Sequence, residues 1–355
     1  MKLLLRSFLG ILLLGILYLC FWPVHIDPVA WDPGETPSLT EGPYKANDYL
    51  ASVDRHLISE YGMGPEDVAI DTSGNVFVGL SNGKIIRFTA NTWESSEFAD
   101  TEGRPLGVQF DSLENLIVAD AVKGLLSISP DANIELLTDS YEGKKMGFVD
   151  DLDIGSDGTI YFSDASAKYG IHEFKDDLME HRPWGSVYSY NPATRETKLL
   201  MDGLHFSNGI ALGRDEQYVM INETASYRIW KYWLKGPKAG SSEIFVEGLP
   251  GFPDNLSYNG DGIFWVACAN PRKADLDGIL PSPFLRKVVM RLPESFQPAV
   301  ERYSMVLAFD ESGKLLHNLQ DTQGTLAPIT SVHQVGDKLY MGSLEDDAWG
   351  IVDMP

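Results

Sequence analysis

Residues 254–268, DNLSYNGDGIFWVAC, follow Gly251-Phe252-Pro253 and decide the fold, because the chain repeats the same unit several times. They predict a strand, a turn at Asn259-Gly260-Asp261-Gly262 and a second strand, since such turn residues between apolar runs are typical of β-hairpins. A strand normally begins on an apolar or β-branched residue. This one begins on Asp254 and Asn255, and the presence of a carboxylate and an amide at a strand start calls for a functional or structural explanation.

Copies of this hairpin unit recur at a period of about 40 to 60 residues. Most copies are followed by a third apolar run and by a fourth just before the next copy, and four strands per repeat are typical of a propeller blade. In the fifth copy, residues 287–292 are expected to form the third strand and residues 304–310 the fourth. The sequence therefore predicts an all-β fold, a six-bladed β-propeller with four-stranded antiparallel blades. The hairpin copies are 66–80, 106–120, 150–164, 208–222, 254–268 and 330–344.

The run RHLIS, residues 55–59, precedes the first copy and has no earlier blade to join. We expect it to complete the last blade beside the strand that ends at Asp353, so that the two ends of the chain close the ring and leave no open edge. A stray strand or helix before the first blade is the alternative.

Equivalent positions of the copies should meet at the channel, because the first strand of every blade lines it. These positions are Glu66, Leu106, Asp150, Asn208, Asp254 and Thr330. Three carboxylates brought close together do not stay ionised without a cation, and an all-oxygen set suits calcium better than zinc. The sequence therefore predicts a Ca²⁺ site. The predicted ligands are Glu66, Asp150, Asn208, Asp254 and the adjacent Asn255. The alternative is that these residues cap the channel strands and bind only water.

The N-terminus reads as a targeting segment. Lys2 and Arg6 precede an uncharged apolar run, Ser7–Trp22, and no small-residue cleavage site follows it. We expect residues 1–23 to be a retained signal anchor, a single transmembrane helix, and residues 24–47 to be a linker. The basic end would stay cytoplasmic, which places a propeller of residues 48–355 in the periplasmic, lumenal or extracellular space.

The charge of the chain restricts its partners. The formal net charge of −23 argues against nucleic acid and suits hard cations. Two cysteines, Cys20 and Cys268, make no disulfide framework, and Cys268 is expected to be a buried apolar residue.

Long motifs occur in order across several blades. They are GPED (64–67), FVDDLDIGSDGTIYFSDAS (148–166), FSNG (206–209), ETASYRIWKYWLKGPKAG (223–240) and LPGFPDN (249–255). With them, the chain from about residue 45 to its end resembles the strictosidine synthase-like family, and most closely the membrane-anchored branch of that family. This family is similar in turn to paraoxonases, regucalcin and gluconolactonases, propellers with a channel calcium and, in many members, lactonase or arylesterase activity.

The resemblance implies calcium ligands at Glu66, Asn208, Asp254 and Asn255, in agreement with the repeat positions. The pattern departs from the family at Asp150-Asp151, where the family usually has Asn-Asp, so the site would hold an extra negative charge.

Two residues that serve as bases in relatives are replaced. The histidine that paraoxonases carry matches Leu106, and the glutamate of true strictosidine synthases aligns with Thr330. Condensation of an amine with an aldehyde is therefore not expected of this chain.

Hydrolysis of a lactone or an aryl ester is the activity that the remaining residues favour. Calcium would polarise the carbonyl, while Asp150 or Asp151 would activate water. His205 lies three residues before a proposed ligand and is a further catalytic candidate. The alternative is a non-catalytic propeller that keeps calcium for stability and serves as a binding or scaffolding module.

Two insertions are expected near the mouth of the channel. Residues 166–184, which carry His172 and His181, would form a lid. Residues 271–303 could form short helices that roof an apolar substrate pocket, although ordinary loop packing explains them equally well.

Overall fold

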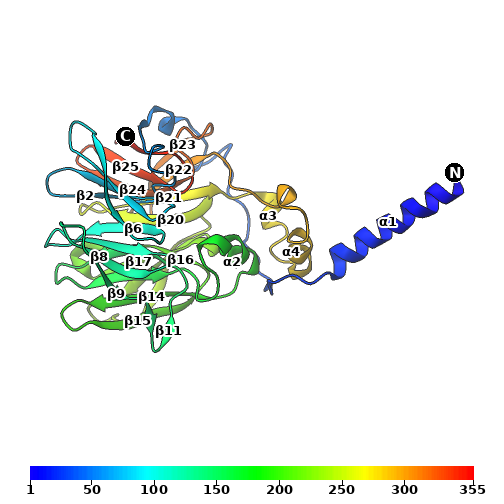
Figure 1. Cartoon of the computed structure of the whole chain (residues 1–355), viewed down its shortest axis with the longest axis horizontal. Helices are drawn as coiled ribbons and strands as arrows, with labels where there is room; N and C mark the ends of the chain where they lie inside the picture. The colour runs from blue at the N-terminus through cyan, green and yellow to red at the C-terminus, as the bar shows by residue number, and fades with distance from the viewer.

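The computed structural model describes residues 1–355, apart from the side chain of Lys2. Six four-stranded antiparallel sheets surround a central axis, and beside them lie short helices and a long N-terminal helix (Figure 1). The first strand of each blade contacts the first strands of both neighbouring blades around the whole ring. The predicted six-bladed propeller is therefore confirmed.

Within each of the first five blades, the four antiparallel strands are arranged in chain order, with the first strand at the channel and the fourth at the outside. The first three blades are β2 (Val68–Ile70), β3 (Val76–Gly79), β4 (Lys84–Phe88) and β5 (Ser95–Asp100); β6 (Pro105–Phe110), β7 (Leu116–Asp120), β8 (Gly124–Ile128) and β9 (Ile134–Thr138); and β12 (Val149–Ile154), β13 (Ile160–Asp164), β14 (Gly185–Asn191) and β15 (Glu196–Leu204). The next two are β16 (Ser207–Leu212), β17 (Tyr218–Glu223), β18 (Arg228–Trp233) and β19 (Ser242–Glu247); and β20 (Gly251–Tyr258), β21 (Ile263–Pro271), β22 (Ser304–Asp310) and β23 (Leu315–Asp321). A small hairpin, β10 (Ser140–Tyr141) and β11 (Lys144–Lys145), precedes the third blade.

The last blade joins the two ends of the propeller. It contains β24 (Ile329–Val335), β25 (Lys338–Ser343), β26 (Ala348–Asp353) and β1 (Asp54–Leu57). In the outer pair, Asp54 lies opposite Ile351 and Leu57 opposite Ala348. The predicted closure of the ring by the run at 55–59 is confirmed, and the 3₁₀ turn η1 (Tyr49–Ser52) leads into it.

The core consists of a separate apolar cluster between each pair of neighbouring blades. Strand β21 contributes side chains to two of these clusters. Phe264, Val266 and Cys268 pack toward the fourth blade, while Trp265 and Ala267 pack toward the sixth. Because successive side chains point to opposite faces, a strand buried on both sides must be apolar at every position. The prediction that Cys268 is buried is confirmed.

The fifth blade differs from its prediction. Residues 287–292 do not form its third strand, because most of them belong to helix α4 (Pro283–Val289) and the turn after it. The third strand is instead β22, residues 304–310, and the fourth is β23. The residues before the apolar run favour a helix over a strand. The Ser282 hydroxyl accepts a hydrogen bond from the Leu285 backbone N–H, and Pro283 occupies the first turn of the helix.

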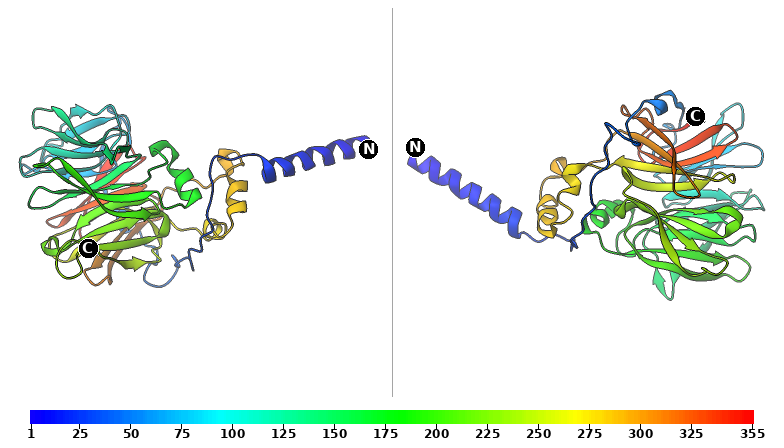
Figure 2. Two further views of the ribbon diagram at one scale, coloured as in Figure 1. Left: turned by 90° about the horizontal axis from the view of Figure 1, so that it is seen from below. Right: turned by 180° about the vertical axis from the view of Figure 1, so that it is seen from behind.

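The two insertions lie on one face of the propeller (Figures 1 and 2). The first forms the 3₁₀ turn η2 (Ile171–Glu173) and helix α2 (Phe174–Glu180). The second forms α3 (Ala274–Asp277), α4 and the turn η5 (Glu294–Phe296). Further 3₁₀ turns are η3 (Arg214–Glu216) and η4 (Thr224–Ser226). The expected lid and roof are therefore present as short helices.

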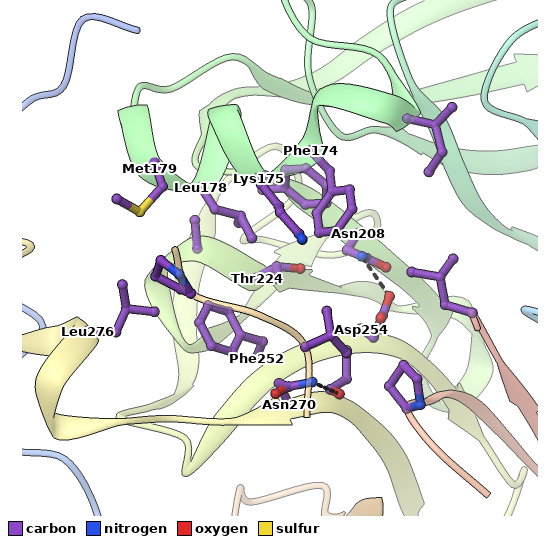
Figure 3. A pocket seen from close by; sticks show the side chains of 18 of the residues that line it. Phe174, Lys175, Leu178, Met179, Asn208, Thr224, Phe252, Asp254, Asn270 and Leu276 are labelled. Atoms are coloured by element: carbon purple, nitrogen blue, oxygen red, sulfur yellow. Dashed lines mark hydrogen bonds between the residues drawn. The ribbon is translucent and has the colours of Figure 1, made fainter. Parts of the chain in front are cut away.

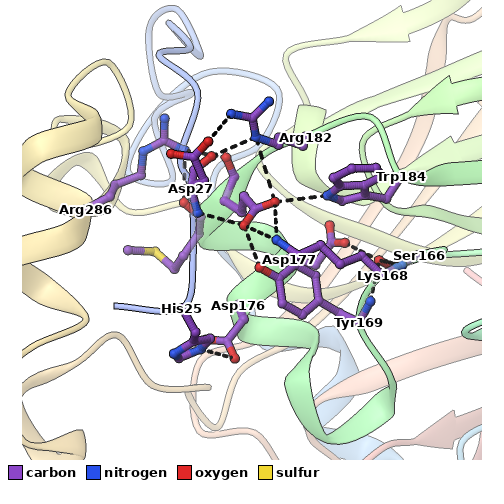
Figure 4. Close-up of polar contacts among 12 residues, drawn as sticks. His25, Asp27, Ser166, Lys168, Tyr169, Asp176, Asp177, Arg182, Trp184 and Arg286 are labelled. Atoms are coloured by element: carbon purple, nitrogen blue, oxygen red, sulfur yellow. Dashed lines mark hydrogen bonds and ion pairs between the residues drawn. The ribbon is translucent and has the colours of Figure 1, made fainter. Parts of the chain in front are cut away.

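Residues 24–31, the first part of the segment expected to be a linker, run along this roof as an extended strap. The buried carboxylate of Glu180 holds the strap through the backbone N–H of Asp27, at 2.8 Å (Figure 4). The same carboxylate accepts hydrogen bonds from Lys168, Tyr169 and Trp184. Burial raises the pKa of Glu180, but these hydrogen bonds outweigh it and lower the pKa to about 2.

Helix α1 (Lys2–Phe21) projects from the same side as the roof (Figure 2). Its segment Leu3–Phe21 has 19 residues and a mean hydropathy of 2.3, so it is long and apolar enough to cross a membrane. Cys20 lies in this helix.

His181 lies between the strap and the fourth blade. Its ring stacks on Trp31 at a centroid distance of 4.1 Å and on His205 at 4.3 Å. Burial, together with the nearby His205 and Arg286, lowers the pKa of His181 to about 2. The lid therefore contains a histidine that is neutral in the folded protein.

The turn that leads into the closing strand should contribute strongly to stability. Leu50, in the turn before β1, is fully buried against the fifth and sixth blades, so Leu50→Ala should lower the free energy of unfolding by about 2 to 5 kcal/mol. Leu57→Ala in β1 itself is the control, because Leu57 is exposed. Chemical denaturation measures both, and equal effects of the two substitutions would contradict this packing.

Acid should weaken the lid through His181. A histidine with a folded pKa of about 2 takes up its proton only on unfolding, so its contribution is complete above the usual pKa of about 6.5 and is lost as the pH falls below it. Between pH 7.5 and 5.5 the loss is about 1.4 kcal/mol. His181→Phe keeps a ring against Trp31, so it should lose that much less than the wild type over the same interval in denaturant unfolding. Equal pH dependence of the two proteins would mean that His181 titrates normally.

Candidate active site

A cavity of about 170 Å³ lies between the channel and the roof. Its floor contains Glu66, Asp150, Asn208 and Asp254, which reach it from the first strands of different blades or from the residues just before them. The walls are apolar and aromatic and come from the blades and from both insertions. They include Leu106, Phe148, Phe174, Leu178, Phe206, Phe252, Leu276 and Met290. The structure therefore brings together four of the five predicted calcium ligands beneath an apolar chamber.

The floor residues are buried and joined in pairs. The Asn208 amide donates to the Asp254 carboxylate at 2.8 Å, as Figure 3 shows. The Asn255 amide donates to Glu66 at 3.0 Å. Gly209 permits this approach, because a Cβ atom there would lie 2.5 Å from the backbone oxygen of Asp254. All five predicted ligands are at most 9% exposed.

Burial and mutual repulsion raise the pKa of the three floor carboxyl groups. The pKa of Glu66 is raised well above its usual value by burial first and by Asp254 next, and that of Asp150 by the same two causes. Burial raises the pKa of Asp254 to about 7. Without a cation, the ionised forms of these groups are therefore disfavoured relative to ordinary carboxyl groups.

The donor set fits a calcium ion by its chemistry. Glu66 Oε2, Asn208 Oδ1 and Asn255 Oδ1 are buried oxygens without a hydrogen-bond partner among the described residues. Calcium takes carboxylate, amide and backbone oxygens. No group of three or more His, Cys, Asp or Glu side chains in the described chain is by itself arranged to hold a metal ion. The two amides would therefore have to complete the site.

Asp150 and Asp151 face different cavities. Asp150 lines the cavity under the roof, whereas Asp151 lines a second cavity of about 320 Å³ farther along the channel, with Asn255 and His333. One oxygen of Asp151 accepts the backbone N–H of Ile210 at 2.7 Å. Of these two residues, therefore, only Asp150 lines the cavity that would hold a molecule under the roof.

His205 is not one of the residues that line the upper cavity in the described structure. Its Nδ1 atom lies 2.9 Å from the buried carboxylate of Glu223, which also accepts hydrogen bonds from Arg228 and Trp230. The ring touches the cavity only through His181, which does line it. The exposed His172 lies on the lid and is not part of that lining either.

Two functional candidates were missed by sequence reasoning. Arg104 is buried near the floor, and its charge lowers the pKa of Glu66 and of Asp150. Lys175 extends from α2 into the cavity (Figure 3). The repeat pattern carries a signal for Arg104, which stands just before the first strand of the second blade. Lys175 lies in an insertion outside the repeat, so no equivalent position points to it.

The propeller is similar to solved structures at low sequence identity. A gluconolactonase from Xanthomonas campestris matches with a TM-score of 0.62 and 16% identity, over 85% of this chain and 90% of that chain. A calcium-binding protein, regucalcin, from Agrobacterium tumefaciens matches with a TM-score of 0.60 and 12% identity, over 85% of this chain and 94% of that chain. At these identities the likeness establishes the fold alone.

Relatives by sequence are much closer. Residues 150–237 match the family described as strictosidine synthase, and residues 42–88 match the family described as strictosidine synthase-like, N-terminal. Adipocyte plasma membrane-associated protein of Bos taurus is 34% identical over 96% of this chain and 87% of its own length. Protein strictosidine synthase-like 6 of Arabidopsis thaliana is 36% identical over 79% of this chain and 76% of its own. With its apolar N-terminal helix, the chain is similar to a membrane-associated protein and belongs to the strictosidine synthase-like family.

Proposed function

We propose that the chain hydrolyses lactones or aryl esters in the upper cavity, and that a calcium ion held by Glu66, Asp150, Asn208, Asp254 and Asn255 is required. The observation that carries this proposal is the position of three buried carboxyl groups under an apolar chamber that a lid covers. Burial of several like charges costs folding energy, so their retention indicates a use for them.

Calcium, when bound, would polarise the carbonyl of the substrate and offset the charge that develops on its oxygen, a contribution of several kcal/mol. The protein supplies the other parts. Asp150 faces the cavity and is the carboxylate best placed to take a proton from water at its Oδ atoms. Lys175 adds a positive charge from the lid. Phe174 and Phe252 flank the chamber and exclude bulk water.

The walls favour an apolar substrate over a sugar lactone. Phe148, Phe174, Phe206 and Phe252 line the chamber, and aromatic walls of this kind bind aryl or alkyl groups better than hydroxyl groups. Among lactones and esters, these wall residues therefore favour the more apolar substrates.

We also propose that the propeller lies on the non-cytoplasmic side of the membrane. Lys2 and Arg6 lie in the N-terminal part of α1, and basic residues at the end of a membrane helix tend to remain in the cytoplasm.

A specific observation favours a second candidate, a calcium-stabilised propeller without catalysis. Leu106 lines the cavity where paraoxonases have a histidine, and Thr330 donates its hydroxyl to the backbone oxygen of Glu66 rather than offering a base. The two candidates share the calcium site and differ only in turnover.

Removal of calcium should affect both stability and activity. An ion that binds only the folded ring adds about 2.7 kcal/mol at a hundredfold excess over its Kd, so a chelator should lower the melting temperature of the full chain. Hydrolysis of phenyl acetate and of a panel of lactones is measured on the same samples. Loss of stability without any hydrolysis would favour the scaffold. An unchanged melt at zero metal content would contradict a calcium site.

Asp254→Asn should separate charge from packing. The amide keeps the size of the side chain but removes one negative charge from the floor, so calcium affinity should fall and hydrolysis should drop by about a hundredfold or more. Asp321→Asn is the control, because Asp321 is equally buried but holds only the loop after β23, through the N–H groups of Gln323 and Thr325. Calcium titration and initial rates below the melting range measure the effect. Full calcium affinity in the Asp254 variant would exclude this residue as a ligand.

A further inference from the structure

Large apolar side chains are exposed on the outer surface of the second insertion. Phe284 and Leu285 begin α4 and are 53% and 42% exposed, and Phe296 in η5 is 73% exposed. Exposed Phe and Leu side chains gathered on one short segment indicate an interaction surface. We call these three residues the roof patch.

The roof patch is tied to the end of the membrane helix. The guanidinium of Arg291, two residues beyond α4, donates to the backbone oxygen of Leu19 at 2.8 Å and to that of Trp22 at 2.5 Å. These oxygens belong to the last turn of α1 and to the residue that caps it, where helices leave carbonyl groups without partners. The contact therefore fixes the roof at the level of residues 19–22.

The length of α1 determines where that level lies in a bilayer. Its apolar segment of 19 residues is about 28 Å long at 1.5 Å per residue, which barely matches a hydrocarbon core of about 30 Å. The whole helix is needed to cross, so its last turn must lie at the membrane surface. Tyr18 and Trp22 agree with this, because Tyr and Trp gather at such interfaces.

The roof cannot easily move away from this level. Arg286 is fully buried, and its guanidinium donates to the backbone oxygens of Met179 and Glu180 in α2 and of Val29 in the strap. Strap, lid and roof are therefore held as one unit, which Figure 4 shows around Asp27 and Arg286.

Charge also distinguishes this insertion. Residues 271–303 carry six basic and four acidic side chains in a chain whose net charge is −23. The excess of basic over acidic side chains means that the insertion is not repelled by anionic lipid headgroups as the acidic chain as a whole would be.

A side cavity lies next to the roof patch. It has a volume of about 320 Å³, is lined by Ile279, Val289 and Phe296, and shares Phe252 and Leu276 with the chamber above the acidic floor. A molecule in the membrane surface would thus meet an apolar passage that borders the candidate active site.

We propose that Phe284, Leu285 and Phe296 are seated in the surface layer of the same bilayer that α1 crosses, and that the side cavity beside them admits lipophilic molecules from this layer to the chamber. The occupant of the roof patch is the lipid surface itself. The second half of the proposal rests on the proposed hydrolase and names its substrates as amphiphilic esters or lactones dissolved in the membrane.

Depth-dependent fluorescence quenching tests the seat of the roof patch. The full chain with Cys20→Ser receives a single cysteine in place of Leu285, Phe296 or Leu113, and each is labelled with an environment-sensitive fluorophore, while the buried Cys268 stays unreactive. Leu113 is the matched control, because it is 75% exposed but lies in the β6–β7 turn. The proteins are reconstituted in phosphatidylcholine vesicles with a nitroxide near the top of the acyl chain.

Labels at 285 and 296 should be strongly quenched by the nitroxide lipid, and the label at 113 should not be. Quenching at 285 and 296 no stronger than at 113 would overturn the membrane seat. A label that reports an apolar environment without quenching would mean that protein, and not lipid, covers the patch, which also contradicts the proposal. Thermal unfolding of each labelled protein confirms that the comparison is made between folded chains.

Hydrolysis in the same vesicles tests the passage. Phe296→Ser should lower the rate on a long-chain aryl ester relative to the rate on phenyl acetate by about tenfold, equivalent to about 1.4 kcal/mol. Equal loss on both esters would reject the passage but not the hydrolase. If the wild type hydrolyses neither ester, the proposed function fails, while the quenching result still decides the membrane seat.

Discussion

Repulsion among the buried carboxyl groups of Glu66, Asp150 and Asp254 is the constraint on which the rest of the structure depends. The closed ring prevents these groups from moving apart, and close contacts such as that of Gly209 with the strand of Asp254 leave no room for relaxation. Only protonation or a cation relieves this repulsion. The charge of the nearby Arg104 offsets part of it, and the buried oxygens of Glu66 and the two asparagines that have no hydrogen-bond partner are the atoms that the proposed cation would contact.

The sequence predicted the ring and the floor of the cavity because both follow from a repeat. Equivalent positions of a propeller converge whatever the loops do, so Glu66, Asp150, Asn208 and Asp254 could be placed together without any knowledge of their contacts. The error in the fifth blade came from KVVMRL, a short apolar run that suits a helix as well as a strand. Ser282 and Pro283 carried the signal for a helix start. The separation of Asp150 and Asp151 into two cavities did not follow from strand alternation alone, because the pairing of β12 with β13 is irregular between Val149 and Leu152.

Residues outside the repeat could not be predicted in the same way. Glu180 binds a backbone N–H 153 positions away, and Arg286 reaches a carbonyl group 257 positions away. Neither pairing leaves a local pattern in the sequence, because each depends on how two insertions and the strap meet over the channel. The neutral state of His181 has the same origin, since it results from burial between Trp31 and His205.

The floor and the roof of the cavity have different physical roles. In the proposed hydrolase, the floor would carry the reaction and the roof would select the substrate. The floor is polar and its residues come from the ring, so the ring sets the chemistry that the proposed hydrolysis would use. The roof is apolar and comes from insertions that the ring does not require, so it can differ while the fold stays the same. In this chain the roof is also bonded to the end of α1. The segment that closes the chamber from above is thus the same segment that contacts the end of the apolar helix, so a substitution at Arg291 would disturb both the roof and its link to α1.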